Sequence, residues 1–306
     1  MSDLKATIRG AANGHEPPED WLDRIRERAR KKRRNQRVLA GFVGLGLSLG
    51  LSIALVADLR TSSPARPGAR GTTALTPCGS GTTVPPTGWW RGDDSPADAA
   101  GGHGAVLRGG ATYGPGIVGH AFALNGQSAY GEVPDNPTLN VGSNDFTVAF
   151  WVKFTSIQGE QVLIQDWVET FDLATSKGWT LIKLQGSGIG FALGAAGVVT
   201  ASGLDLPVDT WIHIAARRKG GSASIFVNGA LVRTRPLNDT QLSLDSPASL
   251  KFGHEGSPED TPGSIDSRGF FLHGGLDEIE LFVGRALSDA QIQQIFLTQS
   301  SCAGSG

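Results

Sequence analysis

Short runs of alternating apolar residues recur from residue 87 onward, and they limit the fold more than any other feature. The run 146–154 has Phe or Val at every second position, which is the period of a β-strand with one face in a core. Four further runs with strand character are 161–167, 179–184, 211–216 and 224–232. Many short strands in a chain with 43 glycines favour an all-β fold, and a two-sheet jelly-roll sandwich suits the length.

Local signals mark a hairpin and the end of the domain. Asn228-Gly229 divides the run 224–232, and both residue types accept the positive φ that a tight hairpin turn requires. The alternating run 279–283 predicts a last strand. Ser288 stands three residues before Gln291, which is the spacing of a helix capping box, and apolar residues follow at 292, 295 and 296. We therefore expect a strand, a turn and a short helix at the end.

The first 57 residues differ from the rest in charge. Residues 1–37 hold 11 Lys or Arg and 6 Asp or Glu, a net charge of +5, whereas the remainder holds 16 and 23, a net charge of −7. Residues 38–57 carry no charge, and as a helix they would span ~30 Å, the thickness of a bilayer core. The sequence predicts one transmembrane helix at 38–57, a basic cytoplasmic segment at 1–37, and an extracytoplasmic C-terminal domain on a single-pass protein of the cell membrane.

Other interpretations of this region stay open. A buried core helix would normally show a polar face, and a cleaved signal peptide would normally have a shorter basic region than 37 residues. The basic residues suit anionic head groups beside a span better than nucleic acid, so no nucleic-acid partner is expected. Gly46 and Gly50 form a GxxxG pattern, which would allow a helix-mediated homodimer.

Residues 58–86 are dense in Ser, Thr, Pro and Gly and predict an extended linker before a domain at 87–302. Cys78, near the end of the linker, and Cys302, just past the last helix, are the only cysteines. An oxidising location permits a disulfide that joins the two ends of the domain, because domain termini often lie close together. The alternative is two unpaired thiols.

Six blocks of the chain carry a resemblance to a known family, and each is weak alone. They are GWWRGDDSPADAAGGHG at 88–104, GPGIVGHAFALNG at 114–126, YGEVPDNPTLNVGSNDFTVAFWVK at 130–153, TWIHIAARRKG at 210–220, IFVNGALV at 225–232 and LDEIELFVGRALSDAQIQQIF at 276–296. In this order they resemble the laminin G-like, or concanavalin A-like, jelly-roll domains of bacterial envelope proteins. The cysteine pair also resembles one seen in a branch of that family.

The resemblance implies a structural calcium ion held by an acid near the first strand and an acid that opens the last strand. In this chain those acids are Asp94 or Asp98 and Asp277. Ca²⁺ takes six to eight oxygen ligands, which carboxylates and loop carbonyls can supply. The alternative is that these acids cap turns and face water.

An enzymatic function must be weighed because some glucanases share the jelly-roll scaffold. Glu278 and Glu280 lie two apart on one strand, and a retaining glycosidase needs two carboxyl groups ~5 Å apart. The third acid of the glucanase pattern is missing here, so we expect no enzyme. His213 has no second His or Cys at metal-ligand spacing and is expected to be a packed, hydrogen-bonded core residue.

Sugar binding by jelly rolls uses aromatic ring faces, and Trp151, Trp167 and Trp179 are the candidate ligand-binding residues. Core packing is the expected role of Trp89, Trp90 and Trp211. The sequence thus predicts a membrane-anchored binding or adhesion module that recognises a glycan or an envelope polymer. The alternatives are a structural or protein-interaction module, with another envelope protein as partner, and a polysaccharide hydrolase.

Overall fold

The structure is a computed structural model, and it describes residues 78–168, 176–254 and 270–303. All of these residues belong to one unit, Thr73–Gly306. The predicted cytoplasmic segment, the transmembrane helix at 38–57 and the linker up to residue 77 lie outside the described residues.

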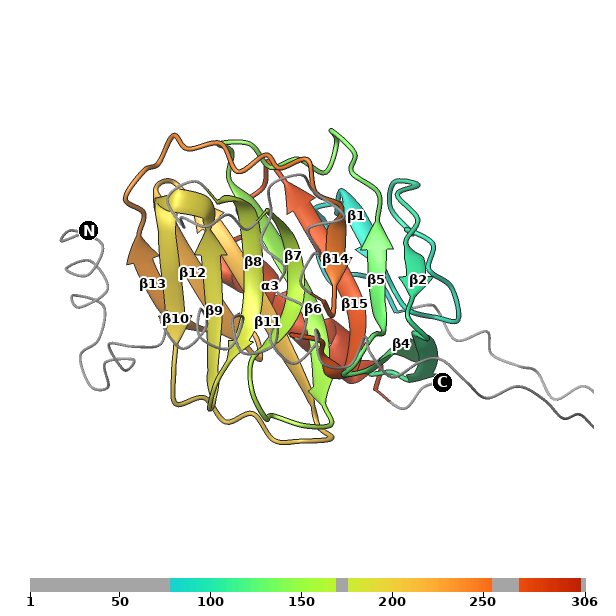
Figure 1. Cartoon of the computed structure of the whole chain (residues 1–306). Helices are drawn as coiled ribbons and strands as arrows, with labels where there is room; N and C mark the ends of the chain where they lie inside the picture. The colour runs from blue at the N-terminus through green and yellow to red at the C-terminus, as the bar shows by residue number, and fades with distance from the viewer. Residues whose placement is uncertain (1–77, 169–175, 255–269, 304–306) are drawn as a thin grey trace, which may run out of the picture. The chain divides into compact units, whose positions relative to one another are not determined.

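Two antiparallel sheets pack face to face (Figure 1). Sheet A has the strand order β13-β12-β11-β6-β15-β4-β3, and β1 pairs with β15. Its strands are β1 (Gly88–Trp90), β3 (Thr112–Pro115), β4 (His120–Asn125), β6 (Phe146–Phe154), β11 (Trp211–Lys219), β12 (Ser222–Val227), β13 (Ala230–Pro236) and β15 (His273–Val283).

Sheet B has the strand order β10-β9-β8-β7-β14-β5-β2. Its strands are β2 (Val106–Arg108), β5 (Tyr130–Val133), β7 (Gln161–Val168), β8 (Lys177–Leu184), β9 (Gly188–Leu193), β10 (Gly197–Ala201) and β14 (Leu250–Phe252). A 3₁₀ turn, η2 (Gly194–Ala196), links β9 to β10, and α3 (Asp289–Ser301) follows β15. This arrangement confirms the predicted all-β jelly-roll sandwich.

The core lies between the sheets, and the alternation of β6 shows how the sequence places it. The Phe and Val residues at 146, 148, 150, 152 and 154 all lie in the core between the sheets. The residues between them, among them Trp151 and Lys153, point to the outer face of sheet A. Phe146 packs against Trp179 and Phe191 of sheet B with ring centroids 5.4 and 5.9 Å apart. The predicted strand at 146–154 is confirmed at both ends.

The two local signals are also confirmed. Asn228 and Gly229 both have positive φ, 49° and 76°, at the turn between β12 and β13. Ser288 is the N-cap of α3: its hydroxyl accepts from the backbone N–H of Gln291, and the Gln291 side chain accepts from the backbone N–H of Ser288.

The predicted single-pass membrane location needs correction. Among the described residues no helix is long and apolar enough to cross a membrane. The one described α-helix, α3, has 13 residues and is ~20 Å long, well short of the ~30 Å of a bilayer core.

Candidate functional site

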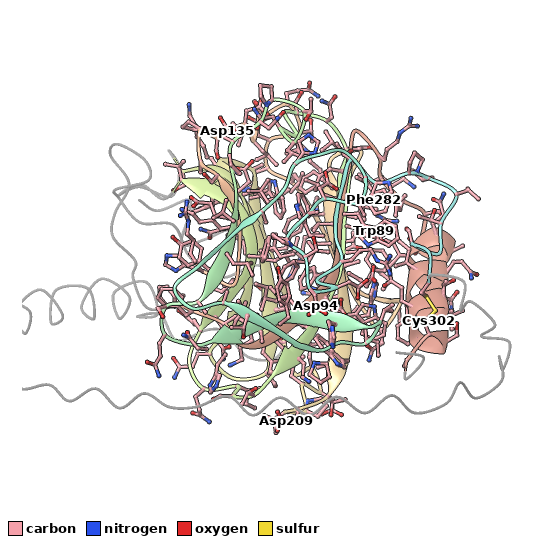
Figure 2. The ribbon with its side chains drawn as sticks, turned by 90° about the vertical axis from the view of Figure 1, so that its right-hand side faces the viewer. Trp89, Asp94, Asp135, Asp209, Phe282 and Cys302 are labelled. Atoms are coloured by element: carbon pink, nitrogen blue, oxygen red, sulfur yellow. A yellow bond between two sulfur atoms is a disulfide. The ribbon has the colours of Figure 1, made fainter. Side chains whose placement is uncertain are left out.

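Helix α3 covers part of the outer face of sheet A. Figure 2 shows the helix outside the sandwich, with Cys302 at its end. An apolar cluster fills the interface between the helix and the sheet; its members are Ala149, Ala215, Phe226, Phe282, Leu287, Ile292 and Ile295. Phe296 of the helix stacks on Trp151 of β6 with ring centroids 5.6 Å apart. This part of the outer face is therefore closed to solvent.

Beneath α3 lies a buried polar network around Glu280. The Glu280 carboxylate accepts hydrogen bonds from the Ser80 hydroxyl at 2.9 Å and from the Gln299 amide at 3.0 Å. The Gln299 amide oxygen in turn accepts from the Trp151 indole N–H at 2.7 Å. Burial raises the pKa of Glu280 well above its usual value, and the nearby charge of Glu278 adds to the shift, although the hydrogen bonds from Ser80 and Gln299 oppose it.

His213 lies beside this network, with its ring 5.3 Å from Trp151 and 5.9 Å from Phe296. Neither of its ring nitrogens has a hydrogen-bond partner among the described residues. Burial lowers the pKa of His213 to about 3, since the charged imidazolium would lose its hydration there. The expected core packing of His213 is confirmed, whereas the expected hydrogen bonding of its ring is not found among the described residues.

Glu278 and Asp277 have other hydrogen-bond partners than Glu280, and a β-bulge interrupts the pairing of β15 between Asp277 and Glu280. Glu278 takes the unusual φ of 48° at this bulge, and its carboxylate accepts from the indole N–H of Trp89 at 2.6 Å. Burial raises the pKa of Glu278 to about 7, although Arg91 lies 3.4 Å away and opposes the shift. The pair Glu278 and Glu280 is thus buried, with separate partners.

Away from α3, part of the outer face of sheet A keeps partly exposed side chains among the described residues. One cross-strand row runs across it from β11 to β3 and consists of Trp211, Lys153, Gly275, Ala123 and Thr112. We call these five residues the Trp211 platform. Trp211, Lys153 and Ala123 are partly exposed and Thr112 is exposed. The row lies on the outer face because the neighbouring residues Ile212, Val152 and Leu276 are buried in the core.

The Trp211 ring reaches across β6 to β15. A Cβ atom added to Gly275 would stand 2.9 Å from Cη2 of the ring, so a glycine is needed for the ring to lie there. The Lys153 ammonium sits 4.9 Å from the ring centroid, in cation–π contact. The platform therefore offers an aromatic ring, a floor of small side chains and one cation. Such a surface can hold a ligand that has an apolar face and a polar rim.

Comparison with known proteins agrees with the fold. The family described as laminin G, in the concanavalin A-like lectin/glucanases superfamily, matches residues 125–293, more than half of the chain. The chain belongs to this superfamily. No curated protein sequence matches it significantly.

Several solved structures have the same lectin-like fold. Domain 4 of AbnA, a GH43 extracellular arabinanase from Geobacillus stearothermophilus, is 19% identical with a TM-score of 0.52, and the match covers 69% of this chain and 97% of that domain. The binding domains of botulinum neurotoxin serotypes D and C1 are 17% and 16% identical with TM-scores of 0.51 and 0.53. Those matches cover 71% and 70% of this chain and only 51% and 52% of the neurotoxin domains. Likeness at this identity shows the shared fold.

The three predicted ligand-binding tryptophans occupy buried positions of this lectin-like fold. Trp179 lies in the core with none of its surface exposed, Trp151 lies beneath α3, and Trp167 of β7 is 7% exposed. None of them offers an open ring face in this structure. Trp89 is partly exposed, and so is Trp211, for which core packing was also expected. The signal in the sequence was its position beside the core residue Ile212, which turns Trp211 to the opposite face.

The three predicted calcium ligands have different surroundings. Both carboxylate oxygens of Asp98 accept backbone N–H groups, from Trp89 and Ala100 on one oxygen and from Gly101 and His103 on the other. Although burial tends to raise the pKa of Asp98, these hydrogen bonds and that of the His103 side chain lower it overall.

Asp277 and Asp94 face other groups. Asp277 accepts from the backbone N–H groups of Ile117, Val118 and Glu278, whereas exposed Asp94 lies 2.6 Å from the His120 ring. Burial, with the nearby charge of Glu278, raises the pKa of Asp277 to about 8. Within the described ranges no three His, Cys, Asp or Glu side chains are grouped so as to hold a metal ion. Calcium binding by these acids therefore stays a prediction.

The predicted disulfide is confirmed. Cys78 and Cys302 are bonded, with Cα atoms 6.2 Å apart and a sequence separation of 224. The bond ties the segment before β1 to the C-terminal end of α3, and Figure 2 shows it beside Cys302. It closes the lectin-like domain end to end.

Proposed function

We propose that this domain is a carbohydrate-binding module in which the Trp211 ring stacks on a sugar ring. The open platform on sheet A is the observation that carries the proposal. An indole ring buries the apolar face of a sugar while the sugar hydroxyls keep their hydrogen bonds at the rim. Ala123 and Thr112, the next residues of the row, are small and at least partly exposed, so they leave room beside the ring for neighbouring sugars of a chain.

The lectin-like fold and its relatives support the proposal. The AbnA domain with the same fold was solved in complex with arabinotriose, and the neurotoxin structures are binding domains. A function in binding glycans or polymers of a cell envelope is consistent with both.

A hydrolase function is less well supported by the geometry. Glu278 and Glu280 are 1% and 0% exposed and are hydrogen-bonded to different partners, so they do not flank a space that a glycosidic bond could enter. Among the described residues of the platform none is a carboxylic acid. We therefore propose binding without hydrolysis.

Replacement of Trp211 tests the site. In a screen of the purified protein on immobilised plant and bacterial polysaccharides, Trp211→Ala is expected to weaken binding at least tenfold, which corresponds to about 1.4 kcal/mol. Gly275→Ala keeps the indole but places a methyl group 2.9 Å from it, so it should also weaken binding by displacing the ring. Affinity gel electrophoresis would measure both effects.

Leu297→Ala is the matched control, because Leu297 is an exposed apolar residue of α3, 51% exposed, and lies outside the platform. It should bind as the wild type does. If Trp211→Ala bound every polysaccharide as tightly as the wild type, the site would be wrong. If the wild type bound no glycan at all, the alternative of a structural or protein-interaction module would replace the proposal.

A further inference from the structure

We propose that the Trp211 platform binds an anionic sugar, a uronic acid, with the Lys153 ammonium as the partner of its carboxylate. This inference rests on the proposed function and specifies the ligand class of the same site. The observation behind it is the position of one cation, the Lys153 ammonium, beside the partly exposed Trp211 ring.

Lys153 has no anionic partner among the residues that the structure describes. No ion pair or hydrogen bond joins its ammonium to a described side chain or carbonyl, and its contact is with the Trp211 ring. The exposed Asp209 lies two residues before Trp211, but its carboxylate forms no ion pair with Lys153. The charge on the platform is therefore uncompensated by the described part of the domain.

Two arginines on the outer side of sheet A are engaged within the protein. Arg91 pairs with Asp93 at 3.1 Å and with Glu278 at 3.4 Å. Arg217 pairs with Asp289 at 2.7 Å and also donates to the carbonyl of Leu287. Structural roles account for both arginines, whereas Lys153 has only the ring of Trp211.

The chemistry of a uronic acid matches this pair. Its pyranose has an apolar face that can stack on the indole, and its carboxylate projects from the rim of the sugar ring. The Lys153 ammonium is a compact charge on a flexible four-carbon stem, so it can turn from the indole to the rim and donate to that carboxylate. The floor of Gly275 and Ala123 has no acidic group that would repel it. A neutral sugar would stack on the Trp211 ring and leave the Lys153 ammonium without an anionic partner.

A matched pair of polymers tests the charge alone. Polygalacturonate and its fully methyl-esterified form share one backbone and differ in the carboxylates. The wild-type protein is expected to bind polygalacturonate at least tenfold more tightly in 50 mM NaCl. The preference should shrink as NaCl rises, since salt screens an exposed ion pair. Isothermal titration calorimetry on the full chain measures both affinities.

Variants of Lys153 complete the test. Lys153→Met keeps the aliphatic stem and removes the charge, so it should bind the two polymers equally, whereas Lys153→Arg should keep the preference. Near-ultraviolet circular dichroism and the melting temperature show that each variant is folded. An equal affinity of the wild type for the two polymers, or a full preference in Lys153→Met, would overturn the uronate inference. Both results differ from the result that would disprove the site itself, in which Trp211→Ala binds every polysaccharide as tightly as the wild type does.

Discussion

Removal of the Cys78–Cys302 disulfide is expected to lower the free energy of unfolding by about 5 kcal/mol. The bond closes a loop of 224 residues, and the chain-entropy estimate for so long a loop gives a value near the upper end of the observed range. The unfolded chain gains most of this freedom, so the effect should appear in the double variant Cys78→Ser, Cys302→Ser and equally in the reduced wild type. Guanidinium unfolding, followed by tryptophan fluorescence, measures it.

The loss should also have a local part. The segment after Cys78 lies against α3: the Ser80 hydroxyl donates to Glu280, and a Cβ atom at Gly81 would stand 2.8 Å from Cβ of Thr298. Without the bond this segment has fewer restraints, so amide hydrogens of α3 should exchange faster than those of β6. A loss below 1 kcal/mol in both the double variant and the reduced protein would contradict the entropic account.

Local patterns in the sequence determine most of the fold. The alternation at 146–154 predicts a strand without reference to any other segment of the chain. The same is true of the hairpin at Asn228-Gly229 and of the capping box at Ser288. In each case the residues that form the signal are the residues that form the structure. These features could therefore be predicted from the sequence.

The site could not be predicted in the same way. Trp151 and Trp211 both point to the outer face of sheet A, and only the position of α3 decides that one is covered and the other open. The contact of Trp211 with Gly275 depends on the pairing of β6 with both β11 and β15. Cross-strand register and helix docking are long-range properties, and no short motif encodes them.

The three acids of β15 illustrate the same limit. Their spacing in the sequence suggests neighbours on one strand, but the bulge at Glu278 sends them to three sets of partners. Asp277 meets backbone N–H groups of the loop after β3, Glu278 meets Trp89, and Glu280 lies under α3. A bulge of this kind with a non-glycine residue at positive φ is not visible in the sequence.

These buried acids predict that the domain loses stability as the pH rises. Burial, with the charge of Glu278 nearby, raises the pKa of Asp277 to about 8, and burial raises the pKa of Glu278 to about 7 and that of Glu280 well above its usual value. Asp166 behaves alike: burial raises its pKa to about 7, although the Ser246 hydroxyl opposes the shift. In the unfolded chain all four ionise near pH 4. Between pH 4 and 8 the folded state therefore holds more protons, and stability falls with rising pH.

His213 acts in the opposite direction at the acidic end of this window. Burial lowers its pKa to about 3, so between pH 3 and 6.5 the unfolded state holds the extra proton, and stability rises with pH. In that range the pH dependence from His213 cancels the pH dependence from about one of the carboxyl groups, and above pH 6.5 it cancels none. The steepest loss of stability should therefore lie near pH 6 to 7, at about 1.4 kcal/mol per pH unit for each carboxyl group that stays protonated only in the folded state. The decline should flatten above pH 7, because Glu278 and Asp166 then ionise in the folded state as well.

The variant Glu280→Gln isolates one of these groups. An amide at this position can still hydrogen-bond to Ser80 and Gln299, but it has no proton to lose. Urea unfolding at intervals from pH 5.5 to 8.5 should give a shallower decline in the variant than in the wild type, with the two differing most at the alkaline end. His213→Leu is the complementary control, because it should change the slope below pH 6.5 and leave it unchanged above. Equal slopes for wild type and Glu280→Gln would show that Glu280 is ionised in the folded protein, and a cation or a rearranged α3 would then have to neutralise it.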